Sequence, residues 1–485
     1  MEVRRTCSGK ISGIIPPMSP LKSAYEIASE RKASNQDTIQ RSSRPQPLRE
    51  DNPLLIDPEA ESDNSYKDFF VDNTPRGEAI GSRATPIEDK KRAVNGISLN
   101  KSISAEAFFE GPMLTWSGFS KMNRSLIDAM NASGVSIKTI PVDSKQEVPD
   151  EMVSEILNMR NTSIHPNSPK IQSMTVPCTY GHGGRRILFT MMETSNGVHP
   201  EYIGKLNLCD EVWVPSDYLA DILVASGLNA EVRVMPLGVD VTRYTPDGDY
   251  LEIADQIEGF KFLSVFNWTL RKGWDVLLKS YLTEFSSSKD VTLILACRMA
   301  GKSNSRELIL NDIKNIKGRI KKRASELPRV VLYDEALDEE DMPCLYRSAD
   351  AFVLLSRGEG FCLPYVEAGA CGLPVIGTAV TAQTDFLNED NSWLVEPDKF
   401  ESNEISDASN INMARLCRFY EGQDFPVYGN SAIEEAMACM RDVYENQGQA
   451  MEKAEVLRQD IYENLTWNHT VNNITARLED LGEER

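Results

Sequence analysis

The sequence predicts an α/β protein with two doubly wound parallel-sheet domains of the Rossmann type, preceded by a disordered N-terminal tail. From residue 104 onward, short apolar runs alternate with stretches of helical spacing, which indicates parallel sheets covered by helices on both faces. A stretch rich in Gly, Pro and Asp at 236–250 separates two such series. Residues 1–103 are poor in aromatic and branched apolar side chains, so they cannot bury enough surface to offset the entropy of ordering.

The first domain is predicted to span 104–245. Its strands are expected in five apolar runs, at 105–112, 134–142, 185–193, 210–216 and 230–238. A helix is expected over 118–133, because five apolar side chains recur there with helical spacing: Phe119, Met122, Leu126, Ile127 and Met130.

The second domain is predicted to span 246–455, and the helical segment 456–485 is predicted to follow it. Its strands are expected at 261–267, 291–297, 329–335, 350–356 and 373–378, with a helix over 273–285 after the first of them. In folds of this kind, ligands bind at the carboxyl ends of the strands, where we therefore expect a cleft.

Composition limits the possible partners and compartments. The formal net charge of −21 argues against general nucleic-acid binding, which requires a basic surface. The nine cysteines contain no CxxC pair, which indicates free thiols in a reducing compartment. No apolar run reaches the roughly 20 residues that span a bilayer, and Arg4 and Arg5 precede no signal-like apolar segment. We therefore expect a cytoplasmic protein, with peripheral membrane contact left open.

The stretch SRGEGFCLPYVEAGACGLPVI, at 356–376, places Glu359 and Glu367 at a strand-to-helix turn. Pro364 suits the first helical position and Gly372 suits the end of the helix, so Glu359 is expected on the loop and Glu367 in the first helical turn. A loop and a helix start offer free backbone N–H groups that suit a phosphate, and the glycines at 358 and 360 allow close approach.

Ionised carboxylates only accept hydrogen bonds, so two of them beside a phosphate site could hold hydroxyl groups on either side of a diphosphate. A nucleotide sugar has this layout of sugar, diphosphate and ribose. The structural alternative is an acid that caps a helix N-terminus. That alternative explains Glu367 alone, but not Glu359 between its glycines.

The turn resembles the motif of retaining glycosyltransferases with the GT-B fold, of the family 4 type (glycosyl transferases group 1). That family carries E-G-F-G-L-P followed by E-A-x-A-x-G-x-P-V, and this chain matches it from Glu359 to Val375 except that Cys362 replaces a glycine. If that position requires positive φ, the cysteine is strained there. The resemblance covers 104–485, and it implies an acceptor-binding first domain, a donor-binding second domain and a final helix that returns to the first.

By this resemblance, Glu359 contacts the donor sugar, Glu367 holds the ribose, and the amides of Gly360 and Phe361 face the diphosphate, with Leu363 beside them. The loop at 266–274 has Arg271 and Lys272 before a helix, where two cations could neutralise a leaving diphosphate. A solvated basic pair is the alternative. The family has an Arg where this chain has Asn267, so Arg271 is a candidate replacement and Asn267 a candidate donor contact.

Weaker candidates lie in the first domain. Gly118 stands where the family has a glycine-rich donor loop, although N-capping of the helix by Ser117 is the plain alternative. Glu193 and His182 are candidate acceptor contacts in a stretch that resembles a T-M-F-E-T subgroup. The DGD at 247–249 is expected to form a turn rather than a metal site. We expect no metal and no cofactor other than the nucleotide sugar as co-substrate.

The implied reaction transfers a glycosyl unit from a nucleotide diphosphate sugar to a carbohydrate, lipid or protein acceptor, with retention of configuration. Three alternatives remain open. A glycosidase also uses two carboxylates but lacks a phosphate cradle. A phosphorylase would carry a lysine-bound pyridoxal cofactor, and a catalytically silent binding or scaffold protein would keep the fold alone.

Overall fold

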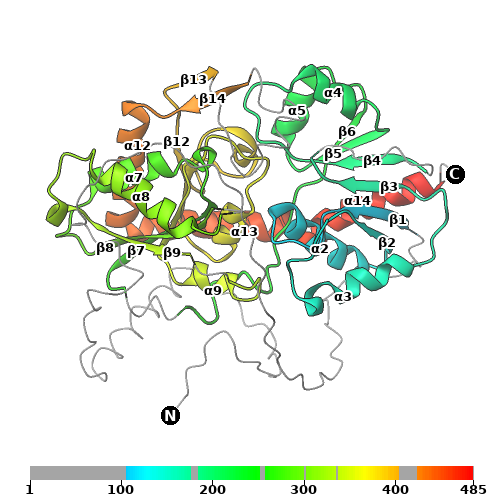
Figure 1. Ribbon diagram of the computed structural model, residues 1–485, viewed down its shortest axis with the longest axis horizontal. Coiled ribbons are helices and arrows are strands. Elements are labelled where there is room, and N and C mark those ends of the chain that lie inside the picture. Colours follow the sequence, from blue (N-terminus) through cyan, green and yellow to red (C-terminus); the bar gives the residue numbers. More distant parts are fainter. Residues whose placement is uncertain are drawn as a thin grey trace, which may run out of the picture.

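The computed structural model describes residues 105–175, 184–251, 257–299, 302–334, 337–402 and 423–483. Within these ranges the chain forms two lobes, each built on a parallel six-stranded sheet with flanking helices (Figure 1). The predicted pair of doubly wound domains is confirmed. The predicted tail at 1–103 lies outside the described residues, and the domain limits at 245 and 455 stay predictions.

The sheet of the first lobe has the strand order β2-β1-β3-β4-β5-β6, and all neighbouring strands are parallel. Its strands are β1 (Glu106–Gly111), β2 (Ser136–Pro141), β3 (Lys170–Ser173), β4 (Arg186–Phe189), β5 (Glu211–Val214) and β6 (Glu231–Val234). Its helices are α2 (Gly118–Ala132), α3 (Asp150–Asn158), α4 (Pro200–Leu206) and α5 (Asp217–Ala225). The strand order changes direction between β1 and β3, and α2 follows β1 at this point.

The sheet of the second lobe has the order β12-β11-β10-β7-β8-β9, again with parallel neighbours. Its strands are β7 (Phe260–Asn267), β8 (Val291–Arg298), β9 (Arg329–Tyr333), β10 (Ala351–Val353), β11 (Val375–Thr378) and β12 (Trp393–Val395). Its helices are α7 (Trp274–Glu284), α8 (Ser305–Lys317), α9 (Met342–Arg347) and α10 (Leu363–Ala370). This is the Rossmann order, and its switch point lies between β7 and β10.

The sequence did not predict several of the strands. Strand β3 has the sequence KIQS, with one apolar residue, and strand β12 has only the three residues WLV, so neither forms a long apolar run. An antiparallel pair of strands, β13 (Lys399–Ser402) and β14 (Asp424–Val427), extends from the second lobe. The side chain of Asn196, in the first lobe, donates to the Asp424 carboxylate at 2.9 Å, so this pair of strands contacts the first lobe.

Three helices end the described chain: α12 (Asn430–Glu445), α13 (Gln447–Asn464) and α14 (Trp467–Glu483). Helix α13 lies close against α10, because a Cβ at Gly369 would lie 2.6 Å from Cδ1 of Ile461. Helix α14 then packs on the first lobe beside α2 (Figure 1). The chain therefore crosses from the second lobe back to the first, and the segment predicted at 456–485 is divided between the end of α13 and α14.

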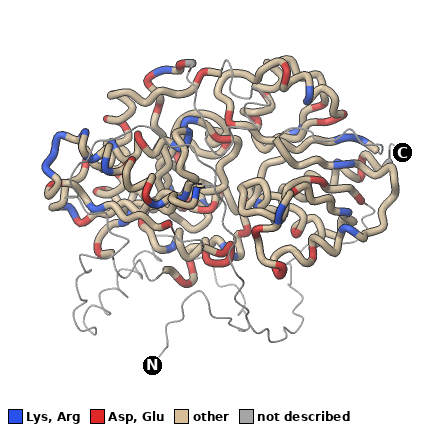
Figure 2. The backbone as a smooth tube through the Cα atoms, in the orientation of Figure 1, with Lys and Arg blue, Asp and Glu red and all other residues tan. Residues whose placement is uncertain are grey.

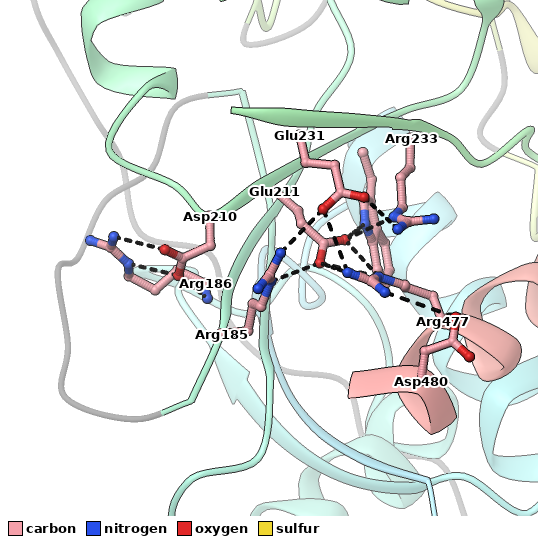
Figure 3. Close-up of polar contacts among 9 residues, drawn as sticks. Arg185, Arg186, Asp210, Glu211, Glu231, Arg233, Arg477 and Asp480 are labelled. Carbon is pink, nitrogen blue, oxygen red and sulfur yellow. Dashed lines mark hydrogen bonds and ion pairs between the residues drawn. The ribbon is translucent and has the colours of Figure 1, made fainter. Parts of the chain in front are cut away.

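A buried ionic cluster attaches α14 to the first lobe (Figure 3). Glu211 in β5 is fully buried, and Arg477 of α14 donates to its carboxylate at 2.7 Å while Arg185 donates at 2.9 Å. Burial acts to raise the pKa of Glu211, but hydrogen bonds from Arg477 and Trp213 hold that pKa below its usual value. A buried carboxylate needs such partners, so α14 is part of the fold of the first lobe.

Charged residues of both signs are interspersed over the two lobes (Figure 2). Among the described residues, no helix is long and apolar enough to cross a membrane. Five of the described cysteines are free thiols, at 209, 297, 362, 371 and 439. Cys344 is disulfide-bonded, so the expectation of free thiols is wrong at this residue.

Candidate functional site

The candidate site lies at the carboxyl ends of β7 and β10, on the two sides of the switch point in the second sheet. Asn267 is the last residue of β7, and the short 3₁₀ helix at Leu270–Lys272 follows it. The loop after β10 carries Glu359 and leads into α10. The predicted motif and the predicted cation pair therefore meet at one sheet edge, where folds of this class bind ligands.

Lys272, Arg271 and Glu359 form an ionic cluster at this edge, in which Arg271 and Glu359 are buried and Lys272 is partly buried. The Lys272 ammonium donates to both oxygens of Glu359, at 2.7 and 2.8 Å. The Arg271 guanidinium donates to Glu359 at 3.2 Å and to the Gly358 carbonyl at 2.6 Å. Glu359 is 4% exposed and Arg271 is 8% exposed. Both cations and the first carboxylate of the motif thus share one location.

A glycine allows the two loops to meet. Gly273 has φ +66°, and a Cβ there would lie 1.7 Å from the Leu355 carbonyl oxygen. Arg357 also joins the two loops: its backbone N–H donates to the Arg271 carbonyl at 2.6 Å, and its guanidinium pairs with Asp275 at 2.8 Å. Only a residue without a side chain fits at 273, so the sequence RKGW places Lys272 against the motif.

The electrostatics of Glu359 follow from its partners. Burial acts to raise its pKa, but the nearby charges of Lys272 and Arg271 and the hydrogen bond from Lys272 hold the pKa below its usual value. Glu359 is therefore ionised at neutral pH. In that state its oxygens accept hydrogen bonds, and the two cations can also act on a further anion placed between them.

Sequence reasoning missed the residues that hold the Glu359 backbone. The Glu359 N–H donates to the Thr381 hydroxyl at 3.0 Å, and this hydroxyl donates to Gln383 at 3.0 Å. Thr381 has φ +61°, which is a strained conformation for a β-branched residue. No motif marked these positions, since their role depends on the fold of the 3₁₀ helix Thr381–Asp385.

The helix after the motif begins slightly earlier than the sequence predicted. Leu363 is its first residue, so Pro364 is the second residue and Glu367 the fifth, just beyond the first turn. The predictions that Pro364 occupies the first position and that Glu367 lies in the first turn were therefore wrong by one residue. Gly372 has φ +75° and follows the helix end, as predicted. Cys362 has φ +76°, so the loop keeps the backbone of a glycine position and strains the cysteine.

The neighbouring motif residues are packed rather than open. Phe361 is 2% exposed, and its ring lies 5.3 Å from that of Phe386. A Cβ at Gly360 would lie 3.0 Å from Cβ of Met191 and 3.2 Å from the backbone nitrogen of Met192. Gly360 therefore permits a close approach between the motif and the first lobe, in addition to any approach to a phosphate.

Glu367, the second carboxylate of the motif, is held by groups from two lobes. The Tyr346 hydroxyl, from α9, donates to one carboxylate oxygen at 2.7 Å, and the Lys121 ammonium, from α2, donates to the other at 2.5 Å. Lys121 also contacts the Tyr244 hydroxyl at 3.2 Å. Burial and the Glu367 charge raise the pKa of Tyr346 well above its usual value, so Tyr346 remains a donor. Neither Lys121 nor Tyr346 was predicted.

The first-lobe candidates are only partly brought to this location. Glu193 follows β4, and its carboxylate pairs with Arg271 at 3.3 Å, so it joins the cluster. Gly118 begins α2, and a Cβ there would meet open space; Ser117 caps the helix by accepting from the Ser120 N–H at 3.2 Å. The N-cap alternative is thus confirmed, while a donor role for Gly118 stays a prediction. His182 lies outside the described residues.

The DGD at 247–249 belongs to a bend region between the lobes, as predicted. Among the described residues, no group of three or more His, Cys, Asp and Glu side chains could hold a metal ion.

Two parallel sheets, joined by ion pairs between their carboxyl edges, define a protein with the GT-B fold. Among solved structures, sucrose-phosphate synthase from Thermosynechococcus elongatus is similar with a TM-score of 0.55 and 14% identity, over 79% of this chain and 100% of that chain. HepE from Anabaena, in complex with UDP-glucose, is similar with a TM-score of 0.52 and 12% identity, over 78% and 100%. Residues 260–409 match the family model of glycosyl transferases group 1.

Curated relatives match over shorter stretches. Mannosylfructose-phosphate synthase from Agrobacterium fabrum is 30% identical over 35% of this chain and 38% of its own length. A GDP-mannose-dependent alpha-mannosyltransferase from Corynebacterium glutamicum is 27% identical over 39% of this chain and 41% of its own length. The chain thus spans about two fifths of the length of these relatives.

Proposed function

We propose that this protein is a retaining glycosyltransferase that moves a hexosyl unit from a nucleotide diphosphate sugar to an acceptor hydroxyl. The observation that carries the proposal is the meeting of Lys272, Arg271 and Glu359 at the switch point of the second sheet. A cation pair beside a carboxylate that accepts hydrogen bonds from hydroxyl groups matches the two ends of such a donor, its diphosphate and its sugar.

In this proposal the donor replaces contacts that the side chains now make with each other. The sugar hydroxyls donate to Glu359, and the diphosphate accepts from Lys272, Arg271 and the amides near Gly360. As the bond between the anomeric carbon and the phosphate oxygen breaks, negative charge develops on the leaving diphosphate. The two cations stabilise this charge more strongly than that of the intact donor, which lowers the barrier.

Retention follows from attack on the face that the diphosphate leaves. The acceptor oxygen forms the new bond to the anomeric carbon, and its proton passes to the oxygen of the leaving phosphate. No protein nucleophile and no cofactor is then required, and the cation pair takes the place that a metal ion has in other transferases. We assign Glu193 to the acceptor side of the site, because it belongs to the first lobe and contacts Arg271 from there.

As the donor sugar we propose a mannosyl or glucosyl unit. This proposal is based on two similar proteins, a GDP-mannose-dependent mannosyltransferase and HepE in complex with UDP-glucose. The acceptor remains a carbohydrate, a lipid or a protein. For the compartment we propose the cytoplasm, because Asn267 begins an Asn-Trp-Thr sequon at the site itself and a glycan there would block it.

The experiment is a thermal-shift screen of the full chain against UDP-glucose, UDP-N-acetylglucosamine, GDP-mannose and their nucleotides, with and without EDTA. A donor that binds the folded state raises the midpoint by mass action, and EDTA should leave the shift unchanged. Release of nucleotide from the hit, accelerated by an acceptor, then establishes transfer. No shift with any of these donors would contradict the proposal.

Assays of the same protein separate the three alternatives. A scaffold protein would bind a nucleotide sugar without cleaving the bond between the sugar and the diphosphate. A glycosidase would cleave nitrophenyl glycosides and ignore nucleotide sugars. A phosphorylase would show the absorbance of a lysine-bound pyridoxal group.

A further inference from the structure

The pair Lys121–Glu367 joins the two lobes at a residue that the proposed function assigns to the donor. Lys121 is the fourth residue of α2 in the first lobe, and Glu367 belongs to α10 in the second. The ammonium lies 2.5 Å from the carboxylate, whose side chain is 5% exposed. The other oxygen of Glu367 already accepts from Tyr346 at 2.7 Å.

Glu367 therefore has both oxygens engaged by protein donors. A ribose would need two adjacent hydroxyls to reach the same carboxylate, and Tyr346 can yield little, since its ring is fully buried. Lys121 can yield more, because its side chain is 26% exposed and carries its charge on a flexible four-carbon stem. Of the two partners, Lys121 is the one that an incoming ribose can displace.

We propose that Lys121 is a positioning residue that competes with the donor ribose for Glu367, so that donor binding is coupled to release of the first lobe from α10. This inference rests on the proposed function. In this account Lys121 lowers donor affinity and holds α2 against the second lobe, and the donor must break that contact to seat its ribose.

A second ion pair of the same helix offers a matched control. Arg124, three residues further along α2, pairs with Glu339 of the second lobe at 2.5 Å. This pair also joins the lobes, but it contacts no residue of the motif: Arg124 otherwise donates to the carbonyls of Met113 and Thr115. Glu339→Gln thus weakens an interlobe contact without touching Glu367.

The test measures binding of UDP and GDP by isothermal titration to the wild-type chain and to Lys121→Met, Lys121→Arg and Glu339→Gln. We expect Lys121→Met to bind the nucleotide about fivefold to tenfold more tightly, Lys121→Arg to restore the wild-type affinity, and Glu339→Gln to leave it unchanged. A general structural defect would weaken binding instead. Unchanged or weaker binding by Lys121→Met overturns the competition.

A measurement without nucleotide keeps the two proposals apart. Hydrogen exchange of the amides in α2 should be faster in Lys121→Met than in the wild type, because a contact to α10 is lost. Equal exchange rates would show that Lys121 does not hold α2 against the second lobe, whatever the nucleotide affinities are. If neither the wild type nor Lys121→Met binds UDP or GDP, the proposed function fails and the competition with it, while the exchange rates still decide whether Lys121 holds the lobes together.

Discussion

Lys272 and Glu359 lie 87 positions apart in the sequence, and the ammonium of the first lies within 2.8 Å of both carboxylate oxygens of the second. Each belongs to the loop after a different strand, and the two strands are neighbours at the point where the strand order reverses. The parallel arrangement thus brings a cation and an acid to one place, and the proposed chemistry depends on this pair.

Removal of the lysine charge should impair turnover more than binding. In Lys272→Met, the leaving diphosphate loses a charge that acts mainly as the bond breaks, so we expect kcat to fall about 10²–10³-fold with a smaller change in KM. Steady-state kinetics with the donor found in the screen measures both constants. Lys321→Met, which changes an exposed lysine of the same lobe, serves as the control. A kcat within a few-fold of the wild type would exclude the assigned role of Lys272.

Glu359 should contribute stability that disappears in acid. Its pKa in the folded chain lies below the usual value of about 4.3, so its contribution is complete above that pH and is lost as the pH falls through the folded pKa. Glu359→Gln leaves the buried Arg271 and the partly buried Lys272 without their carboxylate, and we expect it to destabilise the fold by about 3–5 kcal/mol at pH 7. Urea unfolding at several pH values should show that the difference in the free energy of unfolding between the wild type and Glu359→Gln becomes smaller below pH 4. A difference that is constant with pH would contradict the assignment.

The fold was predictable because its signals are local. Alternating apolar runs and helical spacing predicted the two sheets, and four of the five expected core residues of α2 are buried, from Met122 to Met130. Strands β3 and β12 were not predicted, because β3 has one apolar residue among four and the three residues of β12 lie between polar neighbours, so neither belongs to a longer apolar run. The late strand β10 was predicted longer than it is, since its apolar run continues into the loop that carries the motif.

The site was predictable only where residue type alone indicated its chemistry. Glu359 and Glu367 were identified through the turn motif and its resemblance to a known family, and Lys272 through the basic pair before a helix. Thr381 and Tyr346 carry hydroxyl groups in segments without any motif, and their role follows from hydrogen bonds that only the folded chain brings together. Lys121 is likewise an ordinary helix residue until the second lobe places Glu367 against it. Contacts between distant segments leave no local signal in one sequence.

Gly273 should tolerate no side chain, because its φ is positive and the Leu355 carbonyl lies against it. Alanine at this position would adopt an unfavourable φ near +66° and would place its Cβ 1.7 Å from the Leu355 carbonyl oxygen. We expect Gly273→Ala to destabilise the second lobe by at least about 1–2 kcal/mol and to lower kcat, since Lys272 is the adjacent residue. Gly204→Ala in α4, where a Cβ meets no atom within 4 Å, should instead be neutral or stabilise by up to about 1 kcal/mol. Equal melting temperatures for the two variants would refute this reading of the loop.

Arg477 should decide whether α14 stays on the first lobe (Figure 3). Its guanidinium pairs with Glu211, which is fully buried, so Arg477→Met would leave a buried carboxylate with fewer partners and should lower the stability by about 3–5 kcal/mol. Hydrogen exchange in α14 should rise together with that in β5, because the two elements share this contact. Asp480→Asn is the matched control: Asp480 is 67% exposed and lies 3.8 Å from the same guanidinium, so its change should stay within about 0.5 kcal/mol. If the two variants unfold at the same urea concentration, the cluster does not attach the helix.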